Sequence, residues 1–382
     1  MSGQEIDPIF ATQLAQDVYT IKNVNTRAAF LAKYQKHFDL NEGSLSTGRT
    51  GGYVVNSEHV MALLCTGKGI YKGQAFVAVK GTASLYDALT DLNAGLRTSH
   101  TGFPIHQGFY YAFDSVLMEL RQFVSKLQGI TVIHCVGHSL GGAVATLAAD
   151  WLRTSHVVSA VKLYTFGCPR VGFQSFASKC TSKLSSENIY RVYHKTDPVP
   201  MVPTWPFFDI PNTSVGYLLY SPVPAIPWEY HLMKHYIKSA KTAGSWEGMA
   251  NSRPASHMDN AIESWLKSDG IVSLTASSLE LLNAALLYVV KKVVNLQGIA
   301  MISAATTTLT FLDRMAILLA KGAKISADLS IWVYYLVRKM AALIGITIKE
   351  GTDLTVELIR TVFLRVQKRI TDIIGRVGRE VA

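Results

Sequence analysis

We expect this chain to combine an α/β fold, built on a central and mostly parallel sheet, with a C-terminal all-helical module. A β-branched apolar run over 130–136 passes through a glycine-rich turn into an alanine-rich helical pattern over 140–148. Further short apolar runs, typical of strands, occur before and after this unit and alternate with helical patterns. Past Ser268 they give way to long apolar stretches without strand-like alternation.

Length and composition agree with a two-domain globular protein. The chain has 382 residues, enough for one large or two ordinary domains. Hydrophobic residues make up 49% and charged residues only 17%, which excludes a disordered chain. We predict a catalytic domain over residues 1–265 and a helical, apolar and basic module over residues 270–382.

The charge, the cysteines and the N-terminus limit the cellular location in which the protein can act. A net charge of +10 suggests an anionic partner, and because no nucleic-acid-binding motif is present, a membrane surface is preferred over nucleic acid. The N-terminus has neither a basic nor an apolar leader segment, so we expect no Sec-type signal peptide. The few and scattered cysteines are expected to be buried thiols: Cys65, Cys135, Cys168 and Cys180.

The first 80 residues are expected to form two helices and the first strands of the sheet. Residues 8–40 carry two helical patterns that we expect to pack on the back of the sheet. From Thr47 onwards, glycine turns separate short β-rich runs at 52–55, 60–65 and 74–79, which predict sequential strands entering the core.

A Gly-Thr pair follows the last of these strands. It lets the chain turn, so that the N–H and hydroxyl of Thr82 can serve as donors to an oxyanion. The amphipathic segment from Leu85 to Leu92 fits either a lid or an ordinary surface helix. Further on, His106 precedes a helical pattern that reaches Leu120, and we expect a structural hydrogen bond from it rather than catalysis.

The predicted nucleophile is Ser139, within Gly137-His-Ser-Leu-Gly141. A serine raised on a sharp strand-to-helix turn crowds the residues two before and two after it, so both must lack a side chain. The N–H of Leu140 opens the following helix, where free backbone donors and the helix dipole favour a developing oxyanion.

The predicted acidic partner is Asp197. Strand-like runs at 161–166 and 188–194 follow the serine helix, and Asp197 comes just past the end of the second. Although Asp-Pro is also a common turn dipeptide, its position fits the hydrolase order of serine, aspartate, then histidine.

At this point the motifs match a known family. The chain resembles the class 3 lipases of the α/β-hydrolase fold through four motifs: Lys80-Gly-Thr with Asp87 and Asp91, His106-x-Gly-Phe109, Gly137-His-Ser-Leu-Gly-Gly142, and Thr165-Phe-Gly-x-Pro-Arg-Val-Gly172 with Asp197-Pro-Val-Pro200. The resemblance implies a Ser-Asp-His triad, oxyanion donors at Thr82 and Leu140, and hydrolysis of lipid ester bonds. We expect no cofactor and no required metal, because the sequence contains no cluster of metal ligands, and calcium dependence is left open. Lys80 departs from the family, which usually has arginine there.

The histidine is left open between three positions. The family tends to place it in His-x-(Leu/Met)-x-x-Tyr at the start of a helix, and His231 with the residues up to Tyr236 fits this pattern. His257 lies within the longer spacing that many relatives have, and His235 follows His231 by one helical turn. We prefer His231.

Two patterns in the C-terminal module bear on membranes. The segment from Val293 to Leu312 contains no charged residue. It is long enough to span a bilayer, but it equally fits a buried helix of a bundle. A stripe of apolar residues from Ile359 to Val377 has arginines and lysines on its other faces, which suits an anionic lipid surface or a charged face over a bundle.

The sequence therefore predicts a serine carboxylester hydrolase, a lipase or phospholipase A, that works through an acyl-enzyme. The alternatives are a protein whose helical tail inserts into or binds membranes, and an idle hydrolase fold kept for binding. A basic lipase with an apolar tail is similar to the lipase effectors that bacteria export by type VI secretion. This likeness implies synthesis in the cytoplasm, signal-independent export, action on phospholipids of an anionic membrane, and a cognate immunity protein.

Overall fold

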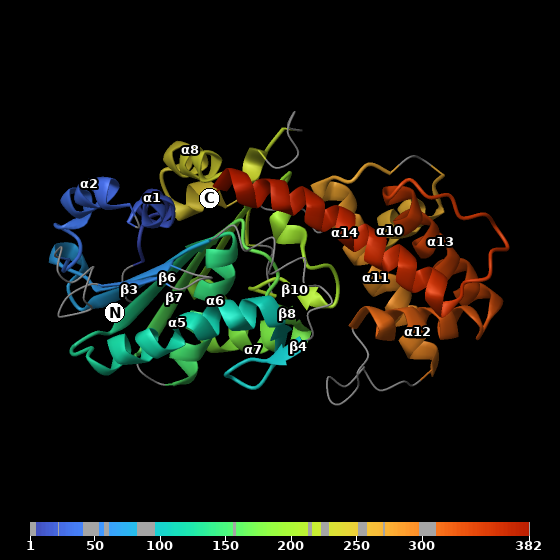
Figure 1. The fold of residues 1–382 in the computed structure, drawn as a ribbon, viewed down its shortest axis with the longest axis horizontal. Coiled ribbons are helices and arrows are strands. Elements are labelled where there is room, and N and C mark those ends of the chain that lie inside the picture. The colour runs from blue at the N-terminus through green and yellow to red at the C-terminus, as the bar shows by residue number, and fades with distance from the viewer. Residues whose placement is uncertain are drawn as a thin grey trace.

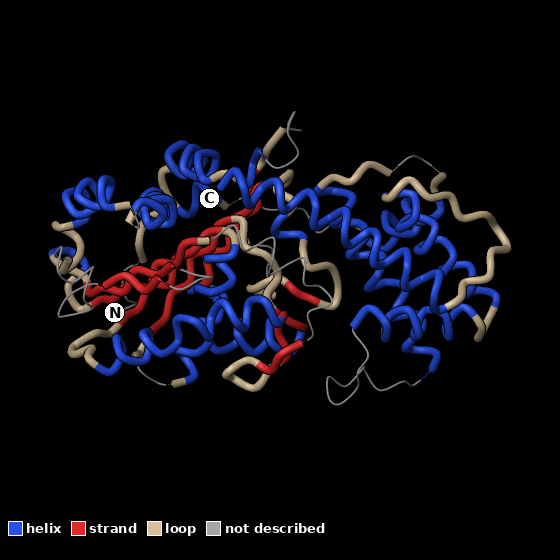
Figure 2. Tube along the Cα trace, viewed as in Figure 1, coloured by secondary structure: helices blue, strands red, loops and turns tan. Residues whose placement is uncertain are grey.

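A central sheet organises the N-terminal part of the chain in the computed structural model (Figure 2). The described residues are 5–21, 23–40, 53–56, 61–81, 96–155, 158–212, 216–222, 229–250, 258–269, 272–297 and 311–381. Within them the sheet has the strand order β1-β2-β3-β6-β7-β9-β11, with bounds Tyr53–Asn56, Met61–Thr66, Gln74–Lys80, Val132–His138, Ala160–Phe166, Ile189–His194 and Tyr217–Leu219. Neighbours from β3 to β11 run parallel, whereas β1, β2 and β3 pair antiparallel. The predicted mostly parallel sheet is confirmed.

Helices cover both faces of this sheet, which explains why its strands read as continuous apolar runs. Along β3, Ala75 and Val77 point into one apolar cluster, while Phe76 and Ala78 point into another on the opposite face. Figure 1 shows the helices in two layers, with one set below the sheet and one above it. The lower helices are α5 (Gln107–Ser125), α6 (Leu140–Thr154) and α7 (Gln174–Leu184), and the upper ones are α1 (Pro8–Asp17), α2 (Val24–Tyr34) and α8 (Met233–Ala243).

A second, smaller sheet lies beside the serine helix on the lower side (Figure 1). Its described strands follow the order β10-β8-β5-β4, all antiparallel, with bounds Phe207–Phe208, Gly172–Phe173, Pro104–His106 and Leu96–Thr98. Because β8 and β10 continue the loops that follow β7 and β9, this sheet ties those loops together.

The C-terminal part is helical, as predicted. Its helices are α10 (Met258–Lys267), α11 (Ala276–Gln297), α12 (Phe311–Ala323), α13 (Ala327–Leu343) and α14 (Val356–Val381). α10 packs on α11 and α13. α11 also contacts the 3-10 turn η4 (Val199–Met201), which follows β9 of the central sheet. The proposed division into 1–265 and 270–382 remains a prediction.

The amphipathic stripe of α14 packs inward. Ile359, Phe363, Val366 and Ile370 are buried, and the helix contacts α12 and α13. This is the bundle arrangement that the sequence left open, with the charged face towards solvent. Among the described residues, no helix has both the length and the apolar character that a bilayer-crossing segment requires. Residues 298–310 of the charge-free stretch lie outside the described residues.

Candidate active site

Ser139 is the single residue between β6 and α6 and forms a sharp turn. Its backbone has φ 58° and ψ −129°, a strained conformation for a residue with a side chain, and its N–H donates to the Phe166 carbonyl at 3.0 Å. A Cβ added at Gly137 would lie 2.2 Å from the carbonyl oxygen of Gly141, and one at Gly141 would lie 2.2 Å from that of Val79. Both glycines are therefore required by close backbone contact, as the Gly-x-Ser-x-Gly pattern predicts.

One imidazole connects the serine to the aspartate. The Nε2 atom of His231 lies 2.9 Å from Ser139 Oγ, and its Nδ1 atom lies 2.9 Å and 3.1 Å from the two carboxylate oxygens of Asp197. All three side chains are buried. A carboxylate can only accept, so Nδ1 carries the proton and Nε2 is free to accept the serine hydroxyl. This is the relation between nucleophile, base and orienting carboxylate that proton abstraction from a serine needs.

The other two histidines have different positions. His235 lies within α8 and faces Glu229 at 3.5 Å, where burial and the neighbouring Lys234 help to lower its pKa. His257 lies outside the described residues. Of the three candidates, His231 is the one whose ring lies between Ser139 and Asp197.

Asp197 is held by donors from three sides. Besides His231, the Tyr236 hydroxyl donates to it at 2.6 Å and the Val199 N–H at 2.9 Å. Burial would raise the pKa of this carboxyl, but the attraction of His231 and these hydrogen bonds outweigh it, so the pKa of Asp197 lies below its ordinary value. Tyr236 was part of the histidine motif, yet the sequence did not indicate its role as a donor to the aspartate.

His138 forms a hydrogen bond to the backbone of His231. Its Nε2 lies 2.8 Å from the carbonyl oxygen of His231, which can only accept, so Nε2 carries the proton. Its Nδ1 then accepts from the Tyr19 hydroxyl at 3.0 Å. Burial, and to a lesser extent the neighbouring His231, lower the pKa of His138 to about 3, so this ring stays neutral. The sequence did not indicate this contact, which joins residues far apart in the chain.

Gly167 makes room for the pair behind the serine. It follows β7 with φ +56°, and an added Cβ would lie 2.8 Å from Asp197 Oδ2 and 2.9 Å from His231 Nδ1. A side chain at this position would occupy the space of the aspartate–histidine hydrogen bond. This glycine, named in the sequence only as part of a motif, is thus a spatial requirement of the site.

The expected oxyanion donors are partly described. Leu140 is the first residue of α6, and its N–H therefore has no acceptor within the helix. Thr82 lies outside the described residues. Its neighbour Gly81 is close to the serine, since an added Cβ there would lie 3.3 Å from Ser139 Cβ.

His106 has the structural role that was expected. It precedes α5, and its Nδ1 accepts the N–H of Gly108 at 3.1 Å, which caps the helix. Across the described ranges, no group of three or more His, Cys, Asp or Glu side chains is arranged to hold a metal ion.

Part of the chain is similar to a known protein family. Residues 76–207 match the family described as Lipase (class 3). This segment is similar to the class 3 lipases. The matched segment contains Ser139 and Asp197, whereas His231 lies beyond it. The resemblance that the four motifs indicated is confirmed for this part of the chain.

Two curated relatives and one solved structure illustrate the match. Secreted mono- and diacylglycerol lipase 1 of Fusarium solani is 38% identical over 149 residues, which are 36% of this chain and 44% of that protein. Toxin TseL of Vibrio cholerae serotype O1 is 36% identical over 118 residues, 30% of this chain and 18% of the toxin. The chain thus spans less than half the length of either relative. The structure of lipase II from Rhizopus niveus is 21% identical, covers 51% of this chain and 74% of its own, and has a TM-score of 0.38.

Proposed function

We propose that the chain is a serine hydrolase of lipid carboxylesters that uses Ser139, His231 and Asp197. The observation that carries the proposal is the pair of contacts of the His231 ring, with Ser139 Oγ at 2.9 Å and Asp197 Oδ2 at 2.9 Å. His231 Nε2 takes the hydroxyl proton while Oγ attacks the ester carbonyl carbon. The resulting imidazolium is stabilised by the ionised Asp197, whose low pKa keeps it charged at neutral pH.

The remaining steps follow from the same groups. The imidazolium gives its proton to the leaving alkoxide, which departs as an alcohol and leaves an acyl-enzyme on Ser139. His231 then removes a proton from water, the hydroxide attacks the acyl carbon, and the fatty acid leaves as Ser139 Oγ takes that proton back from His231. We assign the oxyanion to the N–H groups of Leu140 and Thr82, and the closeness of Gly81 to Ser139 supports the second of these.

Ser139→Ala tests this proposal directly. We expect the purified wild type to hydrolyse p-nitrophenyl esters and to be labelled covalently by a fluorophosphonate, and the variant to do neither. Equal esterase activity in both proteins would remove the triad from the mechanism. Ser155→Ala, a change on the C-terminal side of α6, is the matched control and should behave as the wild type.

We further propose that the substrate is a membrane phospholipid and that the protein acts as a secreted antibacterial effector. The similarity to a bacterial toxin supports this role, and the net charge of +10 supports an anionic surface. Such an enzyme endangers its producer, so we expect a cognate immunity protein. Expression in a bacterium with and without an added export signal tests the role. Ser139-dependent killing only after export supports it, and harmlessness in both compartments contradicts it.

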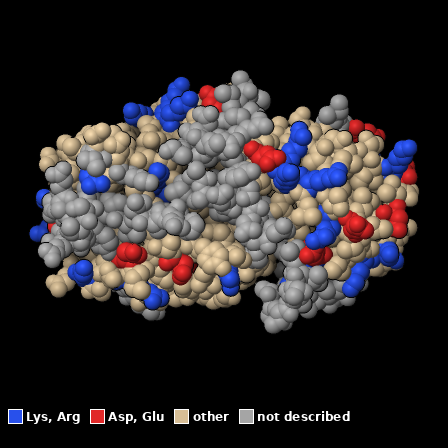
Figure 3. Space-filling view, in the orientation of Figure 1, with Lys and Arg blue, Asp and Glu red and all other residues tan. Residues whose placement is uncertain are grey.

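Exposed basic side chains on α14 are the surface that we assign to the membrane contact. Arg360, Arg365, Lys368 and Arg369 are exposed on the helix, and Figure 3 shows lysines and arginines interspersed with acidic residues over the helical part. Each lysine or arginine near an anionic surface contributes roughly 1 kcal/mol, and salt screens the attraction. Binding to phosphatidylglycerol vesicles should therefore weaken as salt is raised, and more so in Arg365→Gln/Lys368→Gln. Salt-independent binding would argue against this surface.

A further inference from the structure

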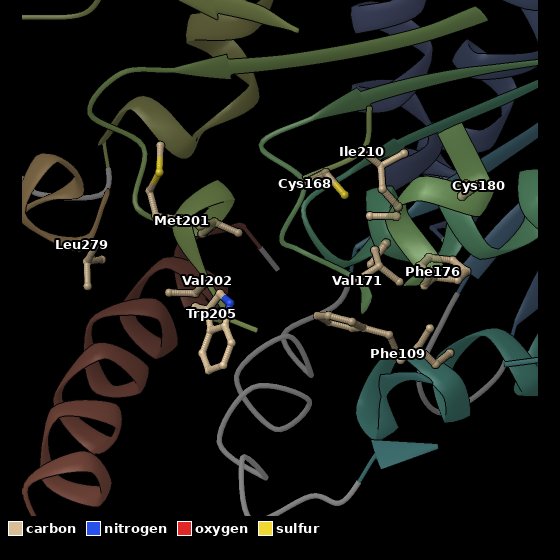
Figure 4. Close-up of a cluster of buried hydrophobic side chains, with 14 of the residues drawn as sticks. Phe109, Cys168, Val171, Phe176, Cys180, Met201, Val202, Trp205, Ile210 and Leu279 are labelled. Atoms are coloured by element: carbon tan, nitrogen blue, oxygen red, sulfur yellow. The ribbon is translucent and has the colours of Figure 1, made fainter. Parts of the chain in front are cut away.

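An apolar hollow lies where the helical part meets the hydrolase part. On the hydrolase side it is lined by His106 at the end of β5 and by the loop that includes Val202 and Trp205. Figure 4 shows Val202 and Trp205 projecting from this loop on the side where Leu279 of α11 lies. A sphere the size of a water molecule can be centred within about 60 Å³ of the hollow, which continues into space open to solvent.

The opposite wall belongs to the helical part. Leu286 of α11, Met340 of α13, and Phe363 and Val366 of α14 all line the hollow. Their side chains are at most 7% exposed, so they are ordered by packing around the hollow. Neither part of the chain alone encloses this space, because one wall comes from each.

His106 brings a hydrogen-bond donor into these apolar surroundings. The residue is 1% exposed, and its Nδ1 accepts from the Gly108 N–H, so in the neutral ring the proton is on Nε2. Among the described residues, that Nε2–H has no hydrogen-bond partner. Unpaired buried donors are rare in proteins, so this one beside a hollow requires an acceptor such as a bound water or a ligand oxygen.

The hollow is linked to the catalytic groups through the segment 167–171. This segment starts at Gly167, beside His231 and Asp197. At its other end, the Val171 carbonyl accepts the His106 N–H at 3.1 Å. Four extended residues reach at most roughly 14 Å, so the Val171 backbone, which His106 contacts, lies within that distance of Gly167.

We propose that this hollow binds an acyl chain of the lipid, that the C-terminal helices form one wall of the lipid site, and that the His106 Nε2–H donates to an oxygen of that lipid. The proposal rests on the lipid esterase function above. Apolar walls with a single polar donor are the usual composition of a site for an apolar ligand with one polar end. The helical part then acts in substrate selection and is more than a membrane contact.

Filling the hollow from the helical side tests the wall. In Val366→Trp the larger side chain occupies the space of the acyl chain, and in Val356→Trp the same change is made at the first residue of α14, which is 40% exposed. We expect kcat/KM for p-nitrophenyl palmitate to fall at least about tenfold more than for p-nitrophenyl butyrate in Val366→Trp, because methylenes lose their site. Val356→Trp should keep the wild-type ratio. The proposal would be overturned if the Val366→Trp protein melts at the wild-type temperature and keeps the wild-type ratio of kcat/KM between the two esters.

Binding to an inactive variant separates this proposal from the esterase mechanism. Ser139→Ala should still bind cis-parinaric acid, followed by its fluorescence, and Ser139→Ala/Val366→Trp should bind it at least about tenfold more weakly. Adding His106→Asn instead, which keeps an acceptor for Gly108 but removes the Nε2 donor, should weaken binding by about tenfold. Equal binding by all three proteins would refute the acyl site. Loss of ester hydrolysis in the wild type with binding intact would refute only the esterase function.

Discussion

Removal of the Tyr236 hydroxyl, which donates to Asp197, has a predictable effect on stability and rate. In Tyr236→Phe the ring keeps its volume in the core, and the hydroxyl that donates to Asp197 at 2.6 Å is lost. A hydrogen bond to a charged group contributes about 1.5–3 kcal/mol, and we expect the free energy of unfolding at neutral pH to fall by about this amount. The imidazolium of the transition state also loses part of its stabilisation. About 1.4 kcal/mol corresponds to tenfold in rate, so kcat should fall about tenfold.

The pH dependence follows from the lowered pKa of Asp197. A depressed folded-state pKa stabilises the protein above the unfolded value of about 3.9, and this contribution is lost as the pH falls through the folded-state pKa. Tyr236→Phe raises that folded-state pKa, so the difference in unfolding free energy from the wild type should be full at neutral pH and shrink below about pH 4.

Urea unfolding across this pH range measures the free energy of unfolding, and ester kinetics measure kcat. The matched control is Tyr164→Phe, in which a fully buried hydroxyl accepts the neutral Ile6 N–H at 3.3 Å. That variant should lose about 0.5–1.5 kcal/mol, with no dependence on pH and no change in kcat. If Tyr236→Phe loses the same stability at every pH and retains its kcat, the hydroxyl does not support the aspartate.

Two further predictions follow from the site and the core. Gly167→Ala should abolish turnover and lower the melting temperature, because its Cβ would lie 2.8 Å from Asp197 Oδ2; Gly345→Ala, also at positive φ but with nothing within 4 Å, should lose only about 1–2 kcal/mol and keep full activity. The cysteines should not react with Ellman's reagent at pH 8 until the protein is unfolded, because burial raises their pKa, for Cys168 to about 12. Rapid reaction of the native protein would show that at least one of these thiols is accessible: Cys65, Cys135, Cys168 or Cys180.

Much of the fold and part of the site were open to prediction because they depend on local chemistry. Only glycines fit around a serine on a strand-to-helix turn, so Gly137 and Gly141 identified Ser139 from its immediate neighbours. Asp197 was predictable for a similar reason, since it directly follows a buried strand whose apolar pattern is visible. The alternation of strands and helices predicted the mostly parallel sheet.

The choice of histidine was beyond local reasoning. His231, His235 and His257 all follow Asp197 at acceptable spacings, and spacing does not tell which ring turns towards the serine. The tertiary structure distinguishes His231 through contacts from distant residues. His138 of β6 donates to its carbonyl, and Tyr236 holds the carboxylate that its ring meets.

The C-terminal helices show the same limit most clearly. Amphipathicity states that one face of α14 is buried, but it does not state whether lipid or protein covers that face. The structure covers it with α12 and α13 and places Phe363 and Val366 beside a hollow shared with His106. Periodicity along one segment determines which side chains avoid water. What they pack against depends on segments brought together from far along the chain, and that was decided only by tertiary packing.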